Sequence, residues 1–258
     1  MSHKREASDT SDAPLSRRQR TEVEEVTYVV NEADALVTIR EATYGGDGVD
    51  LCVGPVPHIR QQKTWDCGYA SLCMLFFALA VRNRDFAEVL CAAGVVVGAA
   101  GGYAPASVGA IQWALEAAWA AGVDPEGRRK IVSKSETPFP ERRDPDAAVG
   151  GCEGCAILKH ARLPATIISY KKAGAAKKLL ADVANHFQTP GRLPGVLTCG
   201  YHVRLVVGAV NSPYEPPHII LLDPNWQEPK YEPRDQKWLE RQDTTFELLL
   251  PVAVTRNR

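Results

Sequence analysis

Several features that would assign a protein class at once are missing from this sequence of 258 residues. It has no apolar run of about 18 residues, so we expect no membrane-spanning helix. The N-terminus, MSHKREASDTSD, lacks the apolar stretch of a secretory signal. The formal net charge of −1 gives no basis for a dominant nucleic-acid or membrane-surface role. We therefore expect a cytoplasmic or nuclear protein with no membrane partner and no specific nucleic-acid partner.

A disulfide framework is also missing. The seven cysteines are odd in number and follow no regular spacing, which favours reduced thiols. Cys152 and Cys155, followed by His160, have the spacing of half a zinc site. A second ligand pair at suitable spacing is absent unless Cys199 folds close to them. A loop with incidental cysteines is the better interpretation, and we expect no metal and no other cofactor.

No glycine-rich phosphate loop of the P-loop type is present either. Residues 94–102 (GVVVGAAGG) are rich in glycine but lack the Lys-Ser/Thr pair that follows such a loop. We expect this segment to be a flexible connection between two helices. Nucleotide cyclisation would need acidic residues for magnesium and basic residues for a triphosphate, and the residues make no chemical case for it.

The first 25 residues are polar and predict a disordered tail. Two basic clusters in this tail have a spacing that resembles a bipartite nuclear-import signal, which would make an import receptor a partner. The alternative is a solvated tail of mixed charge, because acidic residues lie between the clusters. The basic residues concerned are Lys4, Arg5, Arg17, Arg18 and Arg20.

Residues 26–258 predict one α+β domain with its core at 53–252 and a loop excursion at 133–155. The first part of this domain is rich in helical patterns and the last part in β-rich runs, which argues against alternating βαβ units. The expected helices cover 68–82, 86–93, 107–121 and 175–187, and the expected strands cover 26–30, 35–39, 203–210, 218–223 and 245–252.

Cys67 is placed as a nucleophilic cysteine would be. A catalytic cysteine acts as a thiolate, and the start of a helix favours that anion because unpaired N–H groups and the helix dipole point toward it. The segment before Cys67 has no helical periodicity, and a helix that is apolar almost all round begins at or just after it. Gly68 lets the backbone turn tightly beside the sulfur.

The groups that such a thiolate requires are present elsewhere in the sequence. His202 begins a β-rich run, so a strand would hold its imidazole rigidly as the base. Asp223 ends the next run, and it would orient His202 if the two strands pair as a hairpin. Gln61, six residues before Cys67, has a side-chain amide for a developing oxyanion, and the backbone N–H of Cys67 is a second donor. The choice between Gln61 and Gln62 rests on this spacing alone.

These residues resemble two known families. The pattern Gln61-x4-Asp66-Cys67-Gly68 is similar to the nucleophile motif of bacteriocin-processing peptidase domains, which are papain-like enzymes that cut after double-glycine leaders. The wider set resembles the guanylyl cyclase domain-containing protein family of plants and animals. The resemblance implies a papain-like fold with a Cys67, His202 and Asp223 triad and an oxyanion donor in Gln61. The wider set is Val56-Pro57-His58, Trp65-Asp66-Cys67-Gly68, His202-x5-Gly208 and Asp223-Pro224.

The sequence thus predicts a papain-like cysteine hydrolase acting on a peptide, isopeptide or other amide bond in a peptide or protein substrate. Trp65, beside the nucleophile, Gly68 and Trp226 are expected to bind substrate, and Trp226 is also expected to shield the His202–Asp223 pair from water. Packing alone is the plain alternative for both tryptophans. Two other functions stay open at this point. They are guanylyl cyclase activity, which the family name implies, and a catalytically inactive module that binds peptides.

Overall fold

The computed structural model describes twelve segments of the chain, which are 28–30, 49–51, 56–63, 65–99, 102–132, 139, 148–171, 174–189, 191, 193–211, 216–242 and 244–252. The expected tail at 1–25, with its basic clusters, lies outside the described residues. So does the expected strand at 35–39. In the described segments, no helix has both the length and the apolar character needed to span a membrane.

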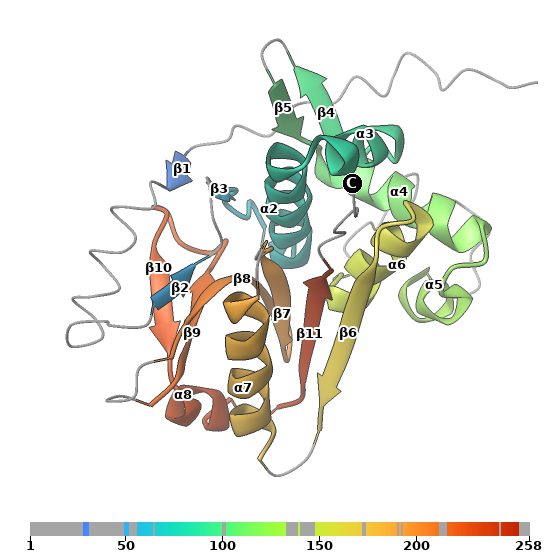
Figure 1. Cartoon of the computed structure of the whole chain (residues 1–258). Helices are drawn as coiled ribbons and strands as arrows, with labels where there is room; N and C mark the ends of the chain where they lie inside the picture. The colour runs from blue at the N-terminus through green and yellow to red at the C-terminus, as the bar shows by residue number, and fades with distance from the viewer. Residues whose placement is uncertain are drawn as a thin grey trace, which may run out of the picture.

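A seven-stranded antiparallel sheet forms the centre of the fold (Figure 1). Its strands follow the order β10-β9-β8-β7-β11-β6, and β2 pairs with β8 beside this path. The runs of valine, isoleucine and leucine in these strands suit a sheet that is buried on both faces. The strands are β2 (Val49–Leu51), β6 (Ala165–Tyr170), β7 (Gly195–Cys199), β8 (His202–Val210), β9 (His218–Leu222), β10 (Tyr231–Arg234) and β11 (Phe246–Pro251).

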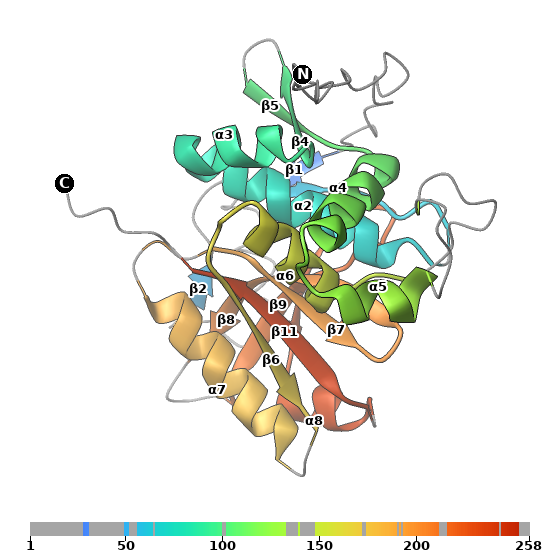
Figure 2. The same cartoon turned by 90° about the vertical axis from the view of Figure 1, so that its right-hand side faces the viewer.

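Helices cover both faces of this sheet, as Figures 1 and 2 show. On β6, Tyr170 hydrogen-bonds to Asp182 of α7, whereas Ile167 lies against Gly151 of α6 on the opposite face. Two smaller two-stranded sheets lie outside the central one. One pairs β1 (Tyr28–Val30) with β3 (Val56–His58), and the other is the hairpin of β4 (Val96–Ala99) with β5 (Gly102–Pro105). The helices are α2 (Cys67–Arg82), α3 (Arg84–Ala92), α4 (Val108–Ala120), α5 (Pro125–Val132), α6 (Gly151–His160), α7 (Ala175–Gln188) and α8 (Gln236–Glu240).

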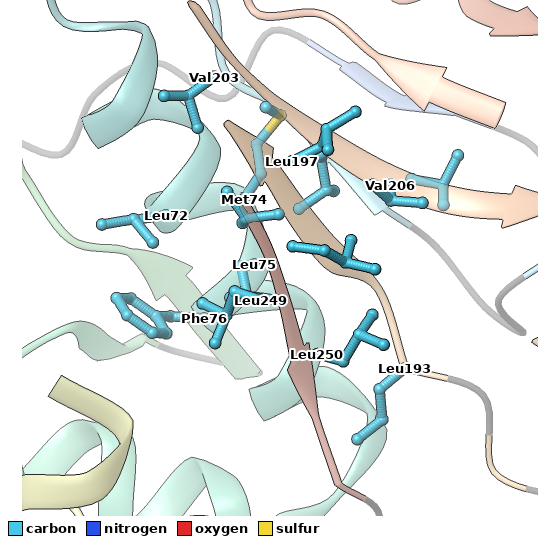
Figure 3. Close-up of a cluster of buried hydrophobic side chains, with 14 of the residues drawn as sticks. Leu72, Met74, Leu75, Phe76, Leu193, Leu197, Val203, Val206, Leu249 and Leu250 are labelled. Carbon is cyan, nitrogen blue, oxygen red and sulfur yellow. The ribbon is translucent and has the colours of Figure 1, made fainter. Parts of the chain in front are cut away.

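Helix α2 is the centre of the hydrophobic core, and 13 of its residues are buried. Figure 3 shows its Leu72, Met74, Leu75 and Phe76 gathered with apolar side chains of the sheet. Each fully buried side chain of this size stabilises the fold by about 1.5–3 kcal/mol, so the helix that begins at Cys67 is held firmly. The sheet residues in the cluster include Leu197, Val203, Val206, Leu249 and Leu250.

Helix α2 is also hydrogen-bonded to β8. The hydroxyl of Ser71, one turn after Cys67, donates to the backbone carbonyl of Val203 at 3.1 Å. Val203 is the neighbour of His202 at the start of β8. The first turn of the helix and the first residues of the strand are therefore fixed beside each other.

The predicted α+β fold is confirmed, and the expected hairpin of β8 with β9 is present. Two expectations at the level of segments were wrong. The excursion does not extend to residue 155, because residues from Gly151 onward form α6, whose start is hydrogen-bonded to Thr198 of β7. Residues 94–102 are not a plain flexible connection, because Val96–Ala99 pairs with Gly102–Pro105 as a hairpin.

Candidate active site

Cys67 is the first residue of α2, as its sequence context predicts. Its side chain is 2% exposed, and its thiol donates to the backbone carbonyl of Tyr201 at 3.9 Å. Tyr201 directly precedes His202 in the turn between β7 and β8. The sulfur therefore lies at the place where the central helix meets the start of β8.

The helix start is not capped by the residue before it. The carboxylate of Asp66 turns back and accepts hydrogen bonds from the backbone N–H groups of Gln62 at 3.0 Å and Lys63 at 3.1 Å. It makes no capping bond to α2. The Asp66 side chain thus fastens the loop before the helix and leaves the helix start without a side-chain cap, which suits an anion at Cys67.

Gly68 allows close contact between α2 and the chain at Val149. A Cβ atom at Gly68 would lie 1.9 Å from the backbone carbonyl oxygen of Val149, far inside contact distance. Gly68 is helical, so its expected role in a tight turn beside the sulfur was wrong. Only a residue without a side chain fits here, because another backbone segment occupies the space.

His202 and Asp223 meet at one end of the sheet. The Nε2 atom of His202 lies 2.8 Å from Oδ1 of Asp223. His202 begins β8, and Asp223 directly follows the last residue of β9, the strand that pairs with β8. Because Nε2 is engaged with Asp223, Nδ1 is the ring nitrogen left for Cys67.

The electrostatics of this pair favour a charged imidazolium. Burial lowers the pKa of His202, but the hydrogen bond to Asp223 and the contact with the Cys67 side chain raise it to about 9. Burial raises the pKa of Asp223, but hydrogen bonds from His202 and from the backbone of Asn225, together with the charge of Arg204, lower it to about 2. At neutral pH the His202 ring is therefore the doubly protonated imidazolium, and the Asp223 side chain is an ionised carboxylate.

Gln61 is brought to the same place by its backbone. Its N–H donates to the carbonyl oxygen of Pro224 at 2.9 Å, directly after Asp223. Its side-chain Nε2 donates to the carbonyl oxygen of Lys63 at 2.9 Å, and its Oε1 is buried without a partner among the described residues. Gln62 is exposed and donates to Arg60, so Gln61 is the glutamine of the two that lies at the site.

The two predicted tryptophans differ in their surroundings. Trp65 is half-buried, and its ring packs edge-on against that of Tyr69 with the ring centroids 5.7 Å apart. It also packs against the hydrophobic core, so packing accounts for its position. Trp226 is 41% exposed, and the Lys230 ammonium lies 5.0 Å from its ring centroid. An open hollow of about 620 Å³ is lined by Asn225, Trp226, Gln227, Glu228, Pro229 and Lys230.

The cysteine pair at Cys152 and Cys155 lies on α6 rather than on a loop. Burial, together with the nearby charge of Glu247, raises the pKa of the Cys152 thiol to about 12. Among the described residues, no group of three histidine, cysteine or acidic side chains is arranged to hold a metal ion.

Three residues at this site have a role that was not assigned from the sequence, although His58 belongs to the Val56-Pro57-His58 motif. Arg204 donates from Nε to Oδ2 of Asp223 at 2.7 Å, and its position two residues after His202 on a strand was a usable signal, because alternate residues share a face. His58 is fully buried, and its Nε2 bonds to the backbone oxygen of Asp223 at 3.1 Å. Tyr201 is fully exposed beside the Cys67 sulfur. Nothing in the local pattern signals these last two roles.

Comparisons with known proteins bear on the family and on the fold. The profile of peptidase family C78 matches residues 57–246. No curated protein matches the chain. Among solved structures, the crystal structure of UfSP from C. elegans is similar in fold, with a TM-score of 0.51 and 12% sequence identity. The match covers 80% of this chain and 34% of that one, so this chain spans about a third of the length of its relative.

The likeness to UfSP confirms the papain-like fold. The match to family C78 confirms the papain-like peptidase relationship that the motif around Cys67 predicts. Neither finding supports the guanylyl cyclase domain-containing family, so that part of the resemblance has no support, and with it the cyclase activity that the family name implies.

Proposed function

Since the chain belongs to peptidase family C78, we propose that Cys67, His202 and Asp223 are the catalytic triad of a cysteine hydrolase that cleaves a peptide or isopeptide bond in a protein substrate. The observation that carries the proposal is the 2.8 Å contact between His202 and Asp223 beside the start of the Cys67 helix. A nucleophile, a base and a group that orients the base are the three parts that such chemistry requires.

In the proposed first step, the Cys67 thiolate attacks the carbonyl carbon of the scissile bond. The carbonyl oxygen becomes an oxyanion as the carbon–sulfur bond forms. The His202 imidazolium then gives its proton to the leaving amine, the carbon–nitrogen bond breaks, and a thioester to Cys67 remains. In the second step, neutral His202 takes a proton from water, and the resulting hydroxide attacks the thioester carbon. The carbon–sulfur bond then breaks, the carboxylic acid leaves, and the Cys67 thiolate and the His202 imidazolium are restored.

Gln61 is the proposed side-chain donor to the oxyanion, with the backbone N–H of Cys67 as the second donor. The backbone bond from Gln61 to Pro224 supports this assignment, because it anchors the residue beside the triad. The side-chain amide donates to Lys63 in the structure, so it would exchange that partner for the oxyanion. Catalytic hydrogen bonds often form fully only when substrate is bound.

Two exposed aromatic side chains are the proposed contacts for the substrate chain on either side of the triad. Tyr201 is fully exposed one residue before His202, and Trp226 is 41% exposed three residues after Asp223. Because β8 and β9 are antiparallel, the start of β8 and the end of β9 lie at the same end of the sheet. Exposed large aromatics contribute little to folding, and they are common contact residues for polypeptide partners.

Selective labelling by an electrophilic thiol probe tests the function. Cys67 is 2% exposed and Cys91 is half-buried, so accessibility alone predicts faster labelling of Cys91. If Cys67 is activated, it should be labelled faster than Cys91. In the variant His202→Ala, this difference in labelling rate should disappear. Equal or slower labelling of Cys67, unchanged in His202→Ala, would leave a module that binds peptides without cleaving them.

We also propose an import receptor as a partner through the two basic clusters of the N-terminal tail, which would place the protein in the nucleus as well as the cytoplasm. The support is their spacing, with Lys4 and Arg5 in one cluster and Arg17, Arg18 and Arg20 in the other. Residues 1–25 fused to a fluorescent protein should concentrate it in nuclei, and substitution of all five residues by alanine should abolish this. An even distribution of the unaltered fusion contradicts the proposal.

A further inference from the structure

The carboxylate of Asp223 is shared between two cations. Its Oδ1 accepts from Nε2 of His202 at 2.8 Å and from the backbone N–H of Asn225 at 2.9 Å. Its Oδ2 accepts from Nε of Arg204 at 2.7 Å. The Asp223 side chain is 7% exposed and that of Arg204 is 15% exposed, so water screens this ion pair weakly.

The register of the sheet explains why Arg204 reaches Asp223. Leu205 of β8 pairs with Leu222 of β9, so one residue further along the register Arg204 lies opposite Asp223. Residues directly opposite each other on antiparallel strands point to the same face and are close enough for an ion pair. His202, two residues before Arg204, shares that face and reaches the same carboxylate from the side.

Helix α8 holds Arg204 in this position. The guanidinium carbon of Arg204 lies 5.4 Å from the ring centroid of Trp238, a geometry in which the negative face of the ring attracts the cation. Arg234 lies 5.1 Å from the same centroid, but its guanidinium is paired with Glu232 at 2.6 Å. Trp238 therefore contacts two arginines, of which Arg204 bonds to the Asp223 carboxylate.

We propose that Arg204 is a positioning residue of the active site, which holds one oxygen of Asp223 and divides its negative charge between Arg204 and His202. The inference rests on the proposed triad. With both oxygens occupied, the carboxylate cannot rotate, so Oδ1 stays directed at the imidazole. Part of the charge of Asp223 is neutralised by Arg204. Asp223 therefore holds the His202 proton less strongly than a carboxylate without an arginine partner would.

This division matters for the step in which His202 protonates the leaving amine. A general acid must release its proton, and an acid that is too strongly stabilised releases it slowly. The charge of Arg204 lowers the pKa of His202 and that of Asp223. Arg204 thus limits how far Asp223 raises the pKa of His202, which ends at about 9.

Several other titratable groups surround the pair and enter any pH profile. His58 lies against the Asp223 backbone from β3, and Cys67 contacts His202 from α2. Burial raises the pKa of Cys199 on β7, while the charge of Arg204 lowers it. The charged and titratable groups to be considered are therefore Cys67, His58, Arg60, Cys199, Arg204, Glu232 and Arg234.

The test is an NMR titration of the His202 imidazole in the full chain, combined with steady-state hydrolysis. In Arg204→Met, which keeps the length of the side chain but loses its charge, the pKa of His202 should rise. The rate constant kcat should fall roughly tenfold to a hundredfold, because the carboxylate is free to rotate. In Arg204→Lys, the charge remains, so the pKa of His202 should stay close to that of the wild type.

Arg234→Met is the matched control, because it removes the other arginine on Trp238 without touching Asp223. It should change the pKa of His202 much less than Arg204→Met does, because Arg234 is paired with Glu232 and not with Asp223. If Arg204→Met does not fold, Arg204→Gln takes its place with the same expected rise. A pKa of His202 that stays constant or falls in the neutral variant would overturn the proposal. The titration needs no substrate, so an inactive protein would contradict the proposed function and still leave this inference decided by the NMR result.

Discussion

The imidazole of His58 bonds to the backbone oxygen of Asp223 at 3.1 Å, although the two residues are 165 positions apart in the sequence. Three residues after His58, the N–H of Gln61 donates to the carbonyl of Pro224. Two adjacent carbonyls therefore join the segment that leads into Cys67 to the segment that carries Asp223. These bonds add to the Ser71–Val203 bond between α2 and β8, and they fix the segment before Cys67, whose strand pairs with β1 and not with the central sheet.

The first prediction concerns His58. Replacement by alanine leaves the buried carbonyl of Asp223 without this donor, which should lower the free energy of unfolding by about 1–3 kcal/mol. It should also lower kcat more than it changes KM, because the backbone of Asp223 loses its hydrogen bond to His58 while the exposed residues that contact substrate are unchanged. Urea denaturation and steady-state kinetics measure the two effects. His58→Gln, which keeps a side-chain N–H, should recover part of both, and wild-type values in His58→Ala would refute this role.

The second prediction concerns pH. His202 must be protonated to serve the leaving amine, and its pKa is raised to about 9. We expect kcat/KM to fall as the pH rises through about 9. In Asp223→Asn the negative charge that raises this pKa is lost, so the alkaline limb should move to lower pH. Profiles of kcat/KM against pH for both proteins measure this shift, and an alkaline limb at the same pH in both would contradict it.

The free energy of unfolding should also depend on the protonation of His202, and it should fall at alkaline pH. Because the folded-state pKa of His202 lies above its ordinary value of 6.5, its contribution to stability is complete below that pH and is lost as the pH rises through about 9. Urea denaturation across this range should show the loss in the wild type and a smaller loss in Asp223→Asn.

The third prediction concerns the oxyanion. Gln61→Ala should lower kcat by roughly a hundredfold to a thousandfold with little change in KM, because the lost hydrogen bond forms mainly in the transition state. Gln62→Ala is the matched control, since Gln62 is the exposed neighbour, its side chain donates to the Arg60 carbonyl, and its backbone bond to Asp66 survives the substitution. Steady-state kinetics on both variants measure the difference. Equal effects of the two substitutions would remove Gln61 from the proposed site.

Much of this site follows from local sequence patterns. The buried helix is predicted by its all-round apolar character, which places Cys67 at its start. The β-rich runs around His202 and Asp223 predict two strands, and a short connection between them predicts a hairpin. These signals succeed because each depends on residues within a few positions of one another.

The remaining features depend on contacts between distant residues. The excursion was extended too far because Gly151 and Gly154 suggest a loop. In the fold they are helical, and the absence of a side chain at each lets α6 lie close to Ile167, Leu72 and Leu249. Likewise, the bond from His58 to Asp223 has no local signal. In a local sequence pattern, glycine indicates flexibility. In a packed structure, it can equally mark a place where two segments of the chain approach each other closely.

The fourth prediction tests such a close approach. Gly68→Ala should destabilise the protein by about 1–3 kcal/mol, because its Cβ would collide with the carbonyl of Val149 and force the helix start to move. It should also slow the labelling of Cys67. Gly109→Ala is the control, since a Cβ there meets nothing closer than 3.9 Å and alanine favours the helix. Thermal unfolding of the two variants in parallel measures this, and equal stability would contradict the contact.

The last prediction concerns the two exposed aromatic residues beside the triad. If they contact the substrate chain, Tyr201→Ala and Trp226→Ala should each raise KM for a protein substrate by about tenfold, the loss expected for a contact of about 1.4 kcal/mol. Neither variant should change kcat strongly or reduce stability, because both side chains face solvent. Val81→Ala is the control, since Val81 is also exposed but lies in the last turn of α2, at the end opposite Cys67. A short amide substrate distinguishes binding from chemistry. It should be hydrolysed at the same rate by all three variants, whereas slower hydrolysis by Tyr201→Ala would mean that this turn positions His202 and does not bind the chain.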